Sequence, residues 1–436
     1  MVVPALAEAV ADAIKKAQSI RTALATATCT LLGTQAEEAV AFGTDAPWEY
    51  DSALLYYSED KRVTAIEPVF AARKEMADDE YLNFRIVIDS LTGASANGAV
   101  PMPFAQTFST PSGDTTYTTP ANETPLDPSF LDTRVALSGD WEKPINRNWS
   151  GVYGAYVSRE FDYTSMGGSA TFSRDTDDRN RTYTAGLALS YDIVSPVGGA
   201  PVGMSAMPVP GKKQISSEDD TKTVVDLLFG ITQVLDRKSL LQLNYTIGTN
   251  NGYLTDPYKI LSVVDNNTGL IVNQDPYLFE NRPDSRLSQS LYAKYVHQFN
   301  EDVIYLTYRY FWDDWDISAH TVDLRYRYEL GGGHYLQPHA RYSIQAKANF
   351  YNAYLLDTDV ATTQTASADY RLGDMTTTTL GLLYGLVFTE KSEFTIRAEV
   401  MQQSGDEPNK FGALDNQILF PDVDAIIFQA GYSFHF

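Results

Sequence analysis

The chain has 436 residues and a formal net charge of −23, with 33 Lys and Arg residues against 56 Asp and Glu residues. This excess of acid disfavours nucleic acid as a partner, because binding to phosphates needs clustered Lys and Arg side chains. Beyond the N-terminus no apolar run reaches about eighteen residues, which excludes a helical membrane span.

The N-terminal residues are expected to lie outside the folded domain. Basic residues up to Arg21 precede an uncharged run rich in small residues, an order that is typical of a secretory signal. We therefore predict a signal peptide over residues 1–36 and a short periplasmic segment over 37–47. Glu8 and Asp12 place acid where a signal is normally basic. A leader extended by a wrong start site and a retained N-terminal helix therefore stay open as alternatives.

Residues 48–436 are predicted to form a single all-β domain. The chain holds 28 Tyr and 20 Phe, yet its mean hydropathy is slightly negative, as expected for strands with one face toward lipid and the other toward water. Alternating stretches are long enough to cross an outer membrane when tilted, which takes at least about nine residues each. The predicted strands are 48–60, 62–75, 81–94, 132–143, 148–160, 167–175, 180–193, 221–234, 238–250, 285–298, 302–314, 318–330, 334–348, 374–388, 391–404 and 423–436.

The connections between these strands are sorted by length. One set is short, with turns near Pro144, Asp177, Leu235, Phe299, Gly331 and Thr389. The other set contains the long segments 95–131, 194–220, 251–284, 349–373 and 405–422. Short periplasmic turns and long outer loops are typical of outer-membrane barrels. The sequence thus predicts a closed antiparallel up-and-down transmembrane β-barrel of about 16 strands, in contact with the lipid of a bacterial outer membrane.

The last predicted strand, residues 423–436, has an aromatic face. Its aromatic residues at even positions are Phe428, Tyr432, Phe434 and Phe436. A terminal aromatic residue after such a face is typical of the closing strand of an outer-membrane barrel. We expect it to pair with residues 48–60, because a closed barrel leaves no unpaired edge in lipid. It is also the expected recognition signal for the barrel-assembly machinery.

Charged residues spaced by two share one face of several strands, and we assign this face to the lumen. For example, Val322 and Leu324 alternate with Asp323 and Arg325. About sixteen strands enclose an interior too wide for side chains to fill, so a water-filled or loop-plugged lumen follows. The candidate lumen-lining residues are Arg85, Lys294, Arg309, Asp323, Arg325, Arg327, Glu329, His339, Arg341, Lys347, Arg397 and Glu399.

An acidic cluster lies in a tight connection at the predicted outer rim. Its residues are Asp313, Asp314, Asp316 and His320. All four are candidates for binding a divalent cation, and Asp313, Asp314 and His320 are candidates for activating water in a hydrolase. A solvated turn flanked by interface tryptophans explains the same residues and is favoured, because the full oxygen spacing of a calcium loop is missing. No GxSxG or HExxH motif occurs, so we expect neither an enzyme nor a cofactor and leave a metal open.

Residues 276–286 mix aromatic side chains with Arg282 and Arg286 at the base of a long loop. The segment either folds inward as a constriction or anchors the loop. Anchoring is favoured, because Asn281 and Pro283 are typical of turns.

Six segments resemble one known family. They are DSLTGASANGA from Asp89, FLDTRVALSGDW from Phe130, REFDYTSMGGSATFSRD from Arg159, GYLTDPYK from Gly252, ENRPDSR from Glu280 and YRYFWDDWDISAHT from Tyr308. In this order they resemble the domain of unknown function 3570 family over most of the chain. Membership implies an outer-membrane β-barrel of Gram-negative bacteria and brings no established activity.

Three functions are open at this point. The leading hypothesis is a channel or export pore for a small solute, in which basic lumen residues create a local field that favours anions. The second is a structural or partner-docking barrel with a loop-plugged lumen, which binds a co-secreted protein or lipoprotein. Its motivation is that the outer loops are long for simple connectors. The third, a hydrolase at the acidic rim, has the least support.

Overall fold

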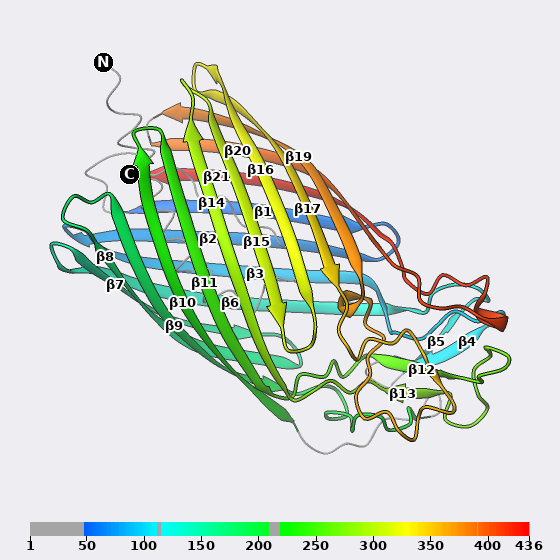
Figure 1. The fold of residues 1–436 in the computed structure, drawn as a ribbon. Helices are drawn as coiled ribbons and strands as arrows, with labels where there is room; N and C mark the ends of the chain where they lie inside the picture. The colour runs from blue at the N-terminus through cyan, green and yellow to red at the C-terminus, as the bar shows by residue number, and fades with distance from the viewer. Residues whose placement is uncertain (1–47, 111–114, 209–218, 390, 436) are drawn as a thin grey trace.

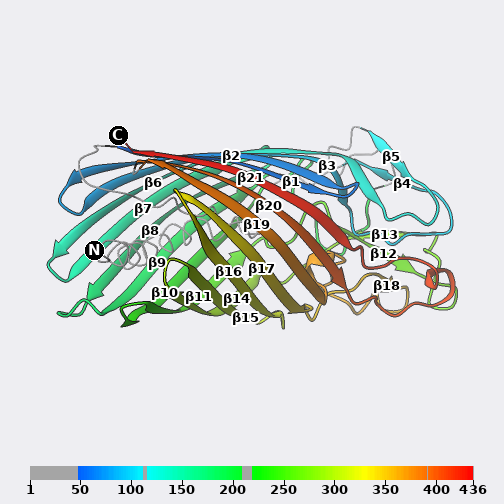
Figure 2. The same ribbon diagram turned by 90° about the horizontal axis from the view of Figure 1, so that it is seen from above.

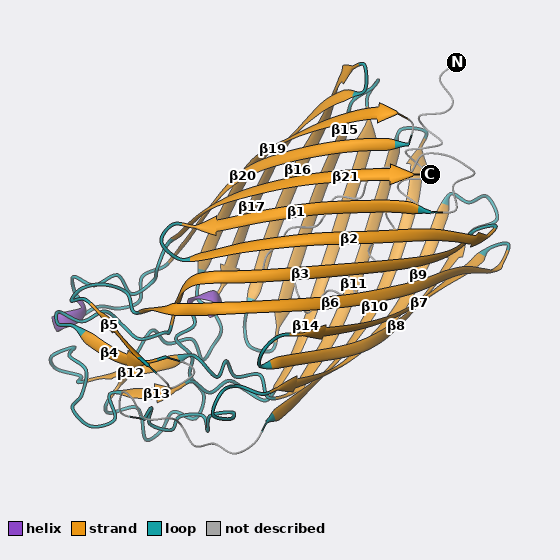
Figure 3. Cartoon of the chain, turned by 180° about the vertical axis from the view of Figure 1, so that it is seen from behind, coloured by secondary structure: helices purple, strands orange, loops and turns teal. Residues whose placement is uncertain are grey.

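Sixteen strands form a closed antiparallel barrel in the computed structural model (Figure 1, Figure 3). The structure describes residues 48–110, 115–208, 219–389 and 391–435, so the expected signal peptide, the segment 37–47 and Phe436 lie outside it. The barrel strands are β1 (Glu49–Glu59), β2 (Val63–Ala77), β3 (Glu80–Ala96), β6 (Leu126–Asn146), β7 (Trp149–Arg159), β8 (Tyr163–Asp175), β9 (Arg181–Val194), β10 (Asp220–Asp236), β11 (Ser239–Gly252), β14 (Ser285–Gln298), β15 (Val303–Asp313), β16 (Ser318–Gly331), β17 (His334–Ala346), β19 (Met375–Thr389), β20 (Ser392–Gly405) and β21 (Val423–His435). Each overlaps one predicted strand, so the predicted fold class is confirmed.

The first and last strands close the barrel. β1 pairs antiparallel with β21, and the register runs from Glu49 opposite His435 to Glu59 opposite Ala425. The expected seam is therefore present. Because every barrel strand has two neighbours, no sheet edge is left for lipid to cover.

The outer face of the wall is apolar. Along β1, Leu54 and Tyr56 are exposed on the outside, while Leu55 and Tyr57 are buried on the inside. The closing strand repeats this pattern, with Phe428 and Tyr432 exposed. A closed barrel with an apolar outer face at this two-residue period is built to sit in lipid, so the protein is an outer-membrane β-barrel.

The two ends of the barrel differ. At one end the turns between neighbouring strands contain no more than five residues, and the long segments all lie at the opposite end. This confirms the predicted short turns and long outer loops. Three connections at the outer end, 60–62, 160–162 and 314–317, are nevertheless tight. Among the residues that the structure describes, no helix is long and apolar enough to cross a membrane.

The long outer loops fold against one another into a single unit, which we call the loop cap (Figure 1, Figure 2). It consists of the described residues of the segments 97–125, 195–219, 253–284, 347–374 and 406–422. No strand was predicted in these segments, but they contain several short ones. These are β4 (Gln106–Ser109), β5 (Thr116–Thr119), β12 (Ile260–Val264), β13 (Tyr277–Phe279) and β18 (Leu355–Leu356), with the short helices η2 (Tyr370–Leu372) and η3 (Gly412–Leu414).

The loop cap has hydrophobic cores of its own. β12 is its central strand, pairing with β13 on one side and with β18 on the other. One core contains only cap residues from four different loops. Its buried members are Val100, Met102, Val264, Ala353, Leu414 and Leu419. Burial of this apolar area holds the loops together, because a strand as short as β18 has too few hydrogen bonds to do so alone.

Candidate functional site

A cavity of about 1250 Å³ lies between the barrel wall and the underside of the loop cap. The wall contributes side chains such as Leu55, Arg85 and His339, and the cap contributes Lys259 and Arg371. Ligand pockets in proteins commonly measure about 300–1,000 Å³, so the space is ample for a small organic molecule.

Charges along the cavity are balanced, although the whole chain is acidic. Among its described lining residues, seven are Lys or Arg and seven are Asp or Glu. The basic residues are Arg62, Arg85, Arg134, Lys222, Lys259, Arg341 and Arg371, and the acidic residues are Glu59, Asp127, Asp132, Glu160, Asp162, Asp256 and Glu399. The acidic overall charge of the chain therefore does not extend to the cavity.

The candidate lumen residues differ in where they lie. Eleven occupy inward-facing positions of the barrel strands, because the residues beside them, such as Leu324 and Ile396, are exposed on the outside. Four of them line the cavity: Arg85, His339, Arg341 and Glu399. Lys347 differs, since it follows the end of β17 and is exposed, with its backbone N–H donating to Oδ1 of Asp374 at 2.9 Å.

His339 ties three strands together inside the barrel. Its Nε2 lies 2.8 Å from Oδ2 of Asp323 on β16, and its Nδ1 lies 2.8 Å from Oε1 of Glu399 on β20. Nε of Arg397 lies 3.9 Å from the same Glu399 oxygen. These side chains pair with one another along the inner face of the wall. The ion pairs link neighbouring strands and stiffen this part of the lumen.

The acidic rim residues do not form one site. Asp313 is buried on the inner side, where Nε of Arg286 donates to its Oδ2 at 2.8 Å and the backbone N–H groups of Trp315 and Ile317 donate to Oδ1. His320 pairs with Ile344, which is exposed on the outer face, so its ring lies on the opposite side of the wall. Within the described part of the chain, no group of three or more His, Cys, Asp or Glu residues is arranged to hold a metal ion.

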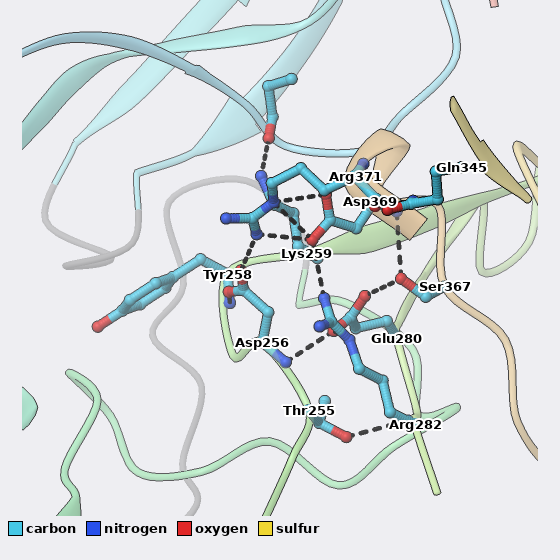
Figure 4. Close-up of polar contacts among 11 residues, drawn as sticks. Thr255, Asp256, Tyr258, Lys259, Glu280, Arg282, Gln345, Ser367, Asp369 and Arg371 are labelled. Atoms are coloured by element: carbon cyan, nitrogen blue, oxygen red, sulfur yellow. Dashed lines mark hydrogen bonds and ion pairs between the residues drawn. The ribbon is translucent and has the colours of Figure 1, made fainter. Parts of the chain in front are cut away.

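Six charged residues of the loop cap form a partly buried network, which we call the cap cluster (Figure 4). They are Asp256, Lys259, Glu280, Arg282, Asp369 and Arg371. Arg282 contacts Glu280 at 2.6 Å and Asp369 at 2.9 Å. Arg371 contacts Asp369 at 2.6 Å and Asp256 at 3.2 Å. The cluster thus joins the loop that carries β12 to the loop that carries β18.

Lys259 connects this cluster to the barrel. Its side chain is buried, and Nζ donates a hydrogen bond to the backbone oxygen of Ala96 at the end of β3. The backbone N–H of the next residue, Ile260, donates to the oxygen of Asn97 at 2.9 Å. The loop cap is therefore fixed to the wall directly above the cavity.

Burial and neighbouring charges shift the pKa values of ionisable groups in the cap cluster. Burial alone would raise the pKa of Asp369, but the guanidinium groups of Arg371 and Arg282 hold it well below its usual range. Burial raises the pKa of Glu280, which shares Arg282 with Asp369. Burial likewise lowers the pKa of Lys259, although Asp369 opposes the shift. Asp369 is consequently the counterion that the two arginines share.

A model of the DUF3570 family, described as a protein of unknown function, matches residues 21–434. The chain belongs to the DUF3570 family. No curated protein matches it.

Among solved structures, the DUF3570 chain is similar to the CymD monoaromatic hydrocarbon channel, with 9% identity, a TM-score of 0.40 and coverage of 90% of this chain and 89% of that one. It is also similar to the outer membrane protein OpdK from Pseudomonas aeruginosa, with 9% identity, a TM-score of 0.38 and coverage of 90% and 99%. For the siderophore receptor PirA from Pseudomonas aeruginosa, the values are 9% identity, a TM-score of 0.41 and coverage of 90% and 62%.

The sequence gives no signal for the contacts within the cap cluster of this DUF3570 protein, although Asp256 and Lys259 lie in the family-like segment from Gly252, and Glu280 and Arg282 lie in the one from Glu280. Arg282 was singled out, and its contacts support the favoured role as a loop anchor. Lys259, Glu280 and Asp369 were assigned no role, since each stands in irregular loop sequence without a period. Only the folded loops bring these residues together.

Proposed function

We propose that this protein is an outer-membrane channel for a small organic solute. The observation that carries the proposal is the cavity of about 1250 Å³, because it lies inside a closed barrel and is lined by many strands of the wall. A barrel of about sixteen strands is wide enough for a lumen that side chains do not fill.

Basic side chains on one wall support a preference for anions. At the inward positions of β14 to β17 there are six Lys or Arg residues against three Asp or Glu residues. The basic residues are Arg286, Lys294, Arg309, Arg325, Arg327 and Arg341, and the acidic residues are Asp313, Asp323 and Glu329. Beside the low-dielectric protein wall, such an excess attracts anionic solutes.

Planar-bilayer recording of the purified protein tests this proposal. We expect stable current steps, with reversal potentials in a salt gradient that indicate anion preference. Conductance is measured both for the intact protein and for a variant whose loop cap is shortened. If neither conducts, the lumen is closed and the channel proposal is wrong.

A second candidate is a barrel that docks a co-secreted protein or lipoprotein. Exposed apolar side chains at the outer end favour it: Phe161 is 83% exposed, Val202 70% and Ile418 62%. A photo-crosslinking residue placed at each of these positions in living cells tests it. One adduct of constant mass and near-stoichiometric yield is expected for docking, whereas the channel proposal predicts none.

Assembly machinery is proposed as a further partner. Its support is the closing strand, where Tyr432 and Phe434 stack with ring centroids 6.5 Å apart near the C-terminus. Replacing Phe434 with Asp should lower the yield of folded barrel in the membrane, whereas replacing Ser433 with Thr should not. Equal yields would contradict recognition of this aromatic face.

A further inference from the structure

The outer half of the lumen contains an apolar wall. Leu55 and Tyr57 of β1 are buried together with Ala65, Ala425 and Ile427, and Leu91 and Met401 pack against them. The strands that supply these residues are neighbours at the barrel seam (Figure 3). The five largest of these residues line the cavity. An apolar surface inside a polar lumen is suited to the hydrocarbon part of a solute.

Arg62 lies beside this apolar wall, in the tight turn between β1 and β2. Its side chain is only 8% exposed, and it lines the same cavity. Among the described residues, none accepts a hydrogen bond from its Nη1. Nε lies 3.8 Å from Oε2 of Glu59, too far for a hydrogen bond, and Oε1 of Glu59 already accepts one from Tyr57.

The position of Arg62 is fixed by both the barrel and the loop cap. Its backbone oxygen accepts a hydrogen bond from Ala94 at 3.2 Å, and its guanidinium carbon lies 4.9 Å from the ring centre of Tyr370. Leaving a buried donor without an acceptor is unfavourable, because the group has lost its hydrogen bond to water. A rigid guanidinium with an unused donor, held at the edge of a cavity, is therefore prepared for an anionic group.

We propose that Arg62 and the apolar wall bind a small organic anion, a carboxylate with a hydrocarbon body. This inference rests on the proposed channel function and names its substrate class. The carboxylate pairs with the guanidinium of Arg62, because the two groups match in shape and charge. The hydrocarbon body covers Tyr57, Leu91 and Met401. The nearby Glu59 carboxylate disfavours a second negative charge, so the site selects monoanions.

Equilibrium dialysis of the purified, detergent-solubilised protein with radiolabelled hexanoate tests the site without requiring transport. We expect saturable binding, with affinity falling about fourfold for each methylene removed between hexanoate and acetate. Hexan-1-ol should bind at least about tenfold more weakly than hexanoate, because it lacks the charge that Arg62 binds.

Variants locate the site. Arg62→Gln should weaken hexanoate binding by at least about tenfold, and Arg62→Lys by less, since it keeps the charge but loses the planar fork. Lys61→Asn is the matched control, because it removes a charge from the same turn at an exposed residue outside the cavity. Its binding should equal that of the unaltered protein. Resistance of the folded barrel to heat in detergent establishes that each variant is intact.

Met401→Gln gives an independent check on the apolar wall. It should weaken binding of hexanoate more than binding of acetate, since only the longer chain reaches the wall. Equal binding by Arg62→Gln and Lys61→Asn, or equal binding of hexanoate and hexan-1-ol, overturns the inference. The channel proposal fails independently of this inference if the protein binds hexanoate but does not conduct in planar bilayers.

Discussion

Arg282 and Asp369 are joined by an ion pair, 2.9 Å between Nη2 and Oδ2, across 87 residues of sequence. Both side chains are buried, and Asp369 also accepts from Arg371 at 2.6 Å. Asp369→Asn leaves the buried guanidinium of Arg282 and the partly exposed one of Arg371 with one counterion fewer. We expect it to lower the free energy of unfolding of the loop cap by about 3 kcal/mol, measured by native-state proteolysis.

Glu280→Gln should cost less than Asp369→Asn, because burial raises the pKa of Glu280 and so weakens its share of the negative charge. Asp275→Asn is the control: this residue is exposed on the same cap and has a positive φ that Asn tolerates. Equal effects of the Asp369 and Asp275 substitutions would show that the cap cluster does not hold the loops.

The barrel was predictable because each strand carries its own pattern. Alternation in β1 assigns Leu54 to the outside and Leu55 to the inside without reference to any other strand. The strand ends were less accurate: β6 begins at Leu126 rather than near 132, since it continues beyond β7 as a ribbon with β3. That extension depends on a partner, which alternation within one strand does not specify.

The loop cap was not predictable, because its contacts also depend on partners that alternation within one strand does not specify. Lys259 and Ala96, which are in contact, lie 163 residues apart in the sequence. Neither residue belongs to a predicted alternating strand. The separation of the rim residues, in contrast, was predictable. His320 has the parity of Val322, which was assigned to the apolar side, so the alternation rule alone already separates His320 from Asp313.

The rim turn gives a second prediction. Asp313→Ala removes the partner of Arg286 and the acceptor of two backbone N–H groups, so it should lower the free energy of unfolding by about 3 kcal/mol. His320→Ala should change it by less than about 1 kcal/mol, because His320 is exposed on the outer face. Thermal unfolding in detergent measures both. A larger loss from the His320 substitution would contradict this assignment.

Glu160 gives a prediction about pH. It lines the cavity from the outer turn between β7 and β8, and burial, with Asp132 nearby, raises its pKa to about 7. The carboxyl is neutral below that pH and charged above it, so lowering the pH from about 8 to about 6 removes a negative charge from the cavity. Reversal potentials should therefore shift toward anion preference.

Two variants decide whether Glu160 is responsible. At both pH values, Glu160→Gln should show the anion preference that the unaltered protein has at the lower pH. Glu123→Gln changes an exposed carboxylate outside the cavity and should keep the pH dependence. If the pH dependence survives the Glu160 substitution, another group near the cavity titrates in its place.

The loop cap should limit flow through the barrel, because it roofs the cavity and is fixed to the wall through Lys259. Replacing residues 254–283 with a short Gly-Ser linker removes β12, the central strand of the cap, and leaves β11 and β14 intact. Single-channel conductance should then be several times higher, whereas Asp275→Asn in the same segment should leave it unchanged. Equal conductance of the shortened and intact proteins, with both barrels folded, would mean that solute passes the cap without displacing it.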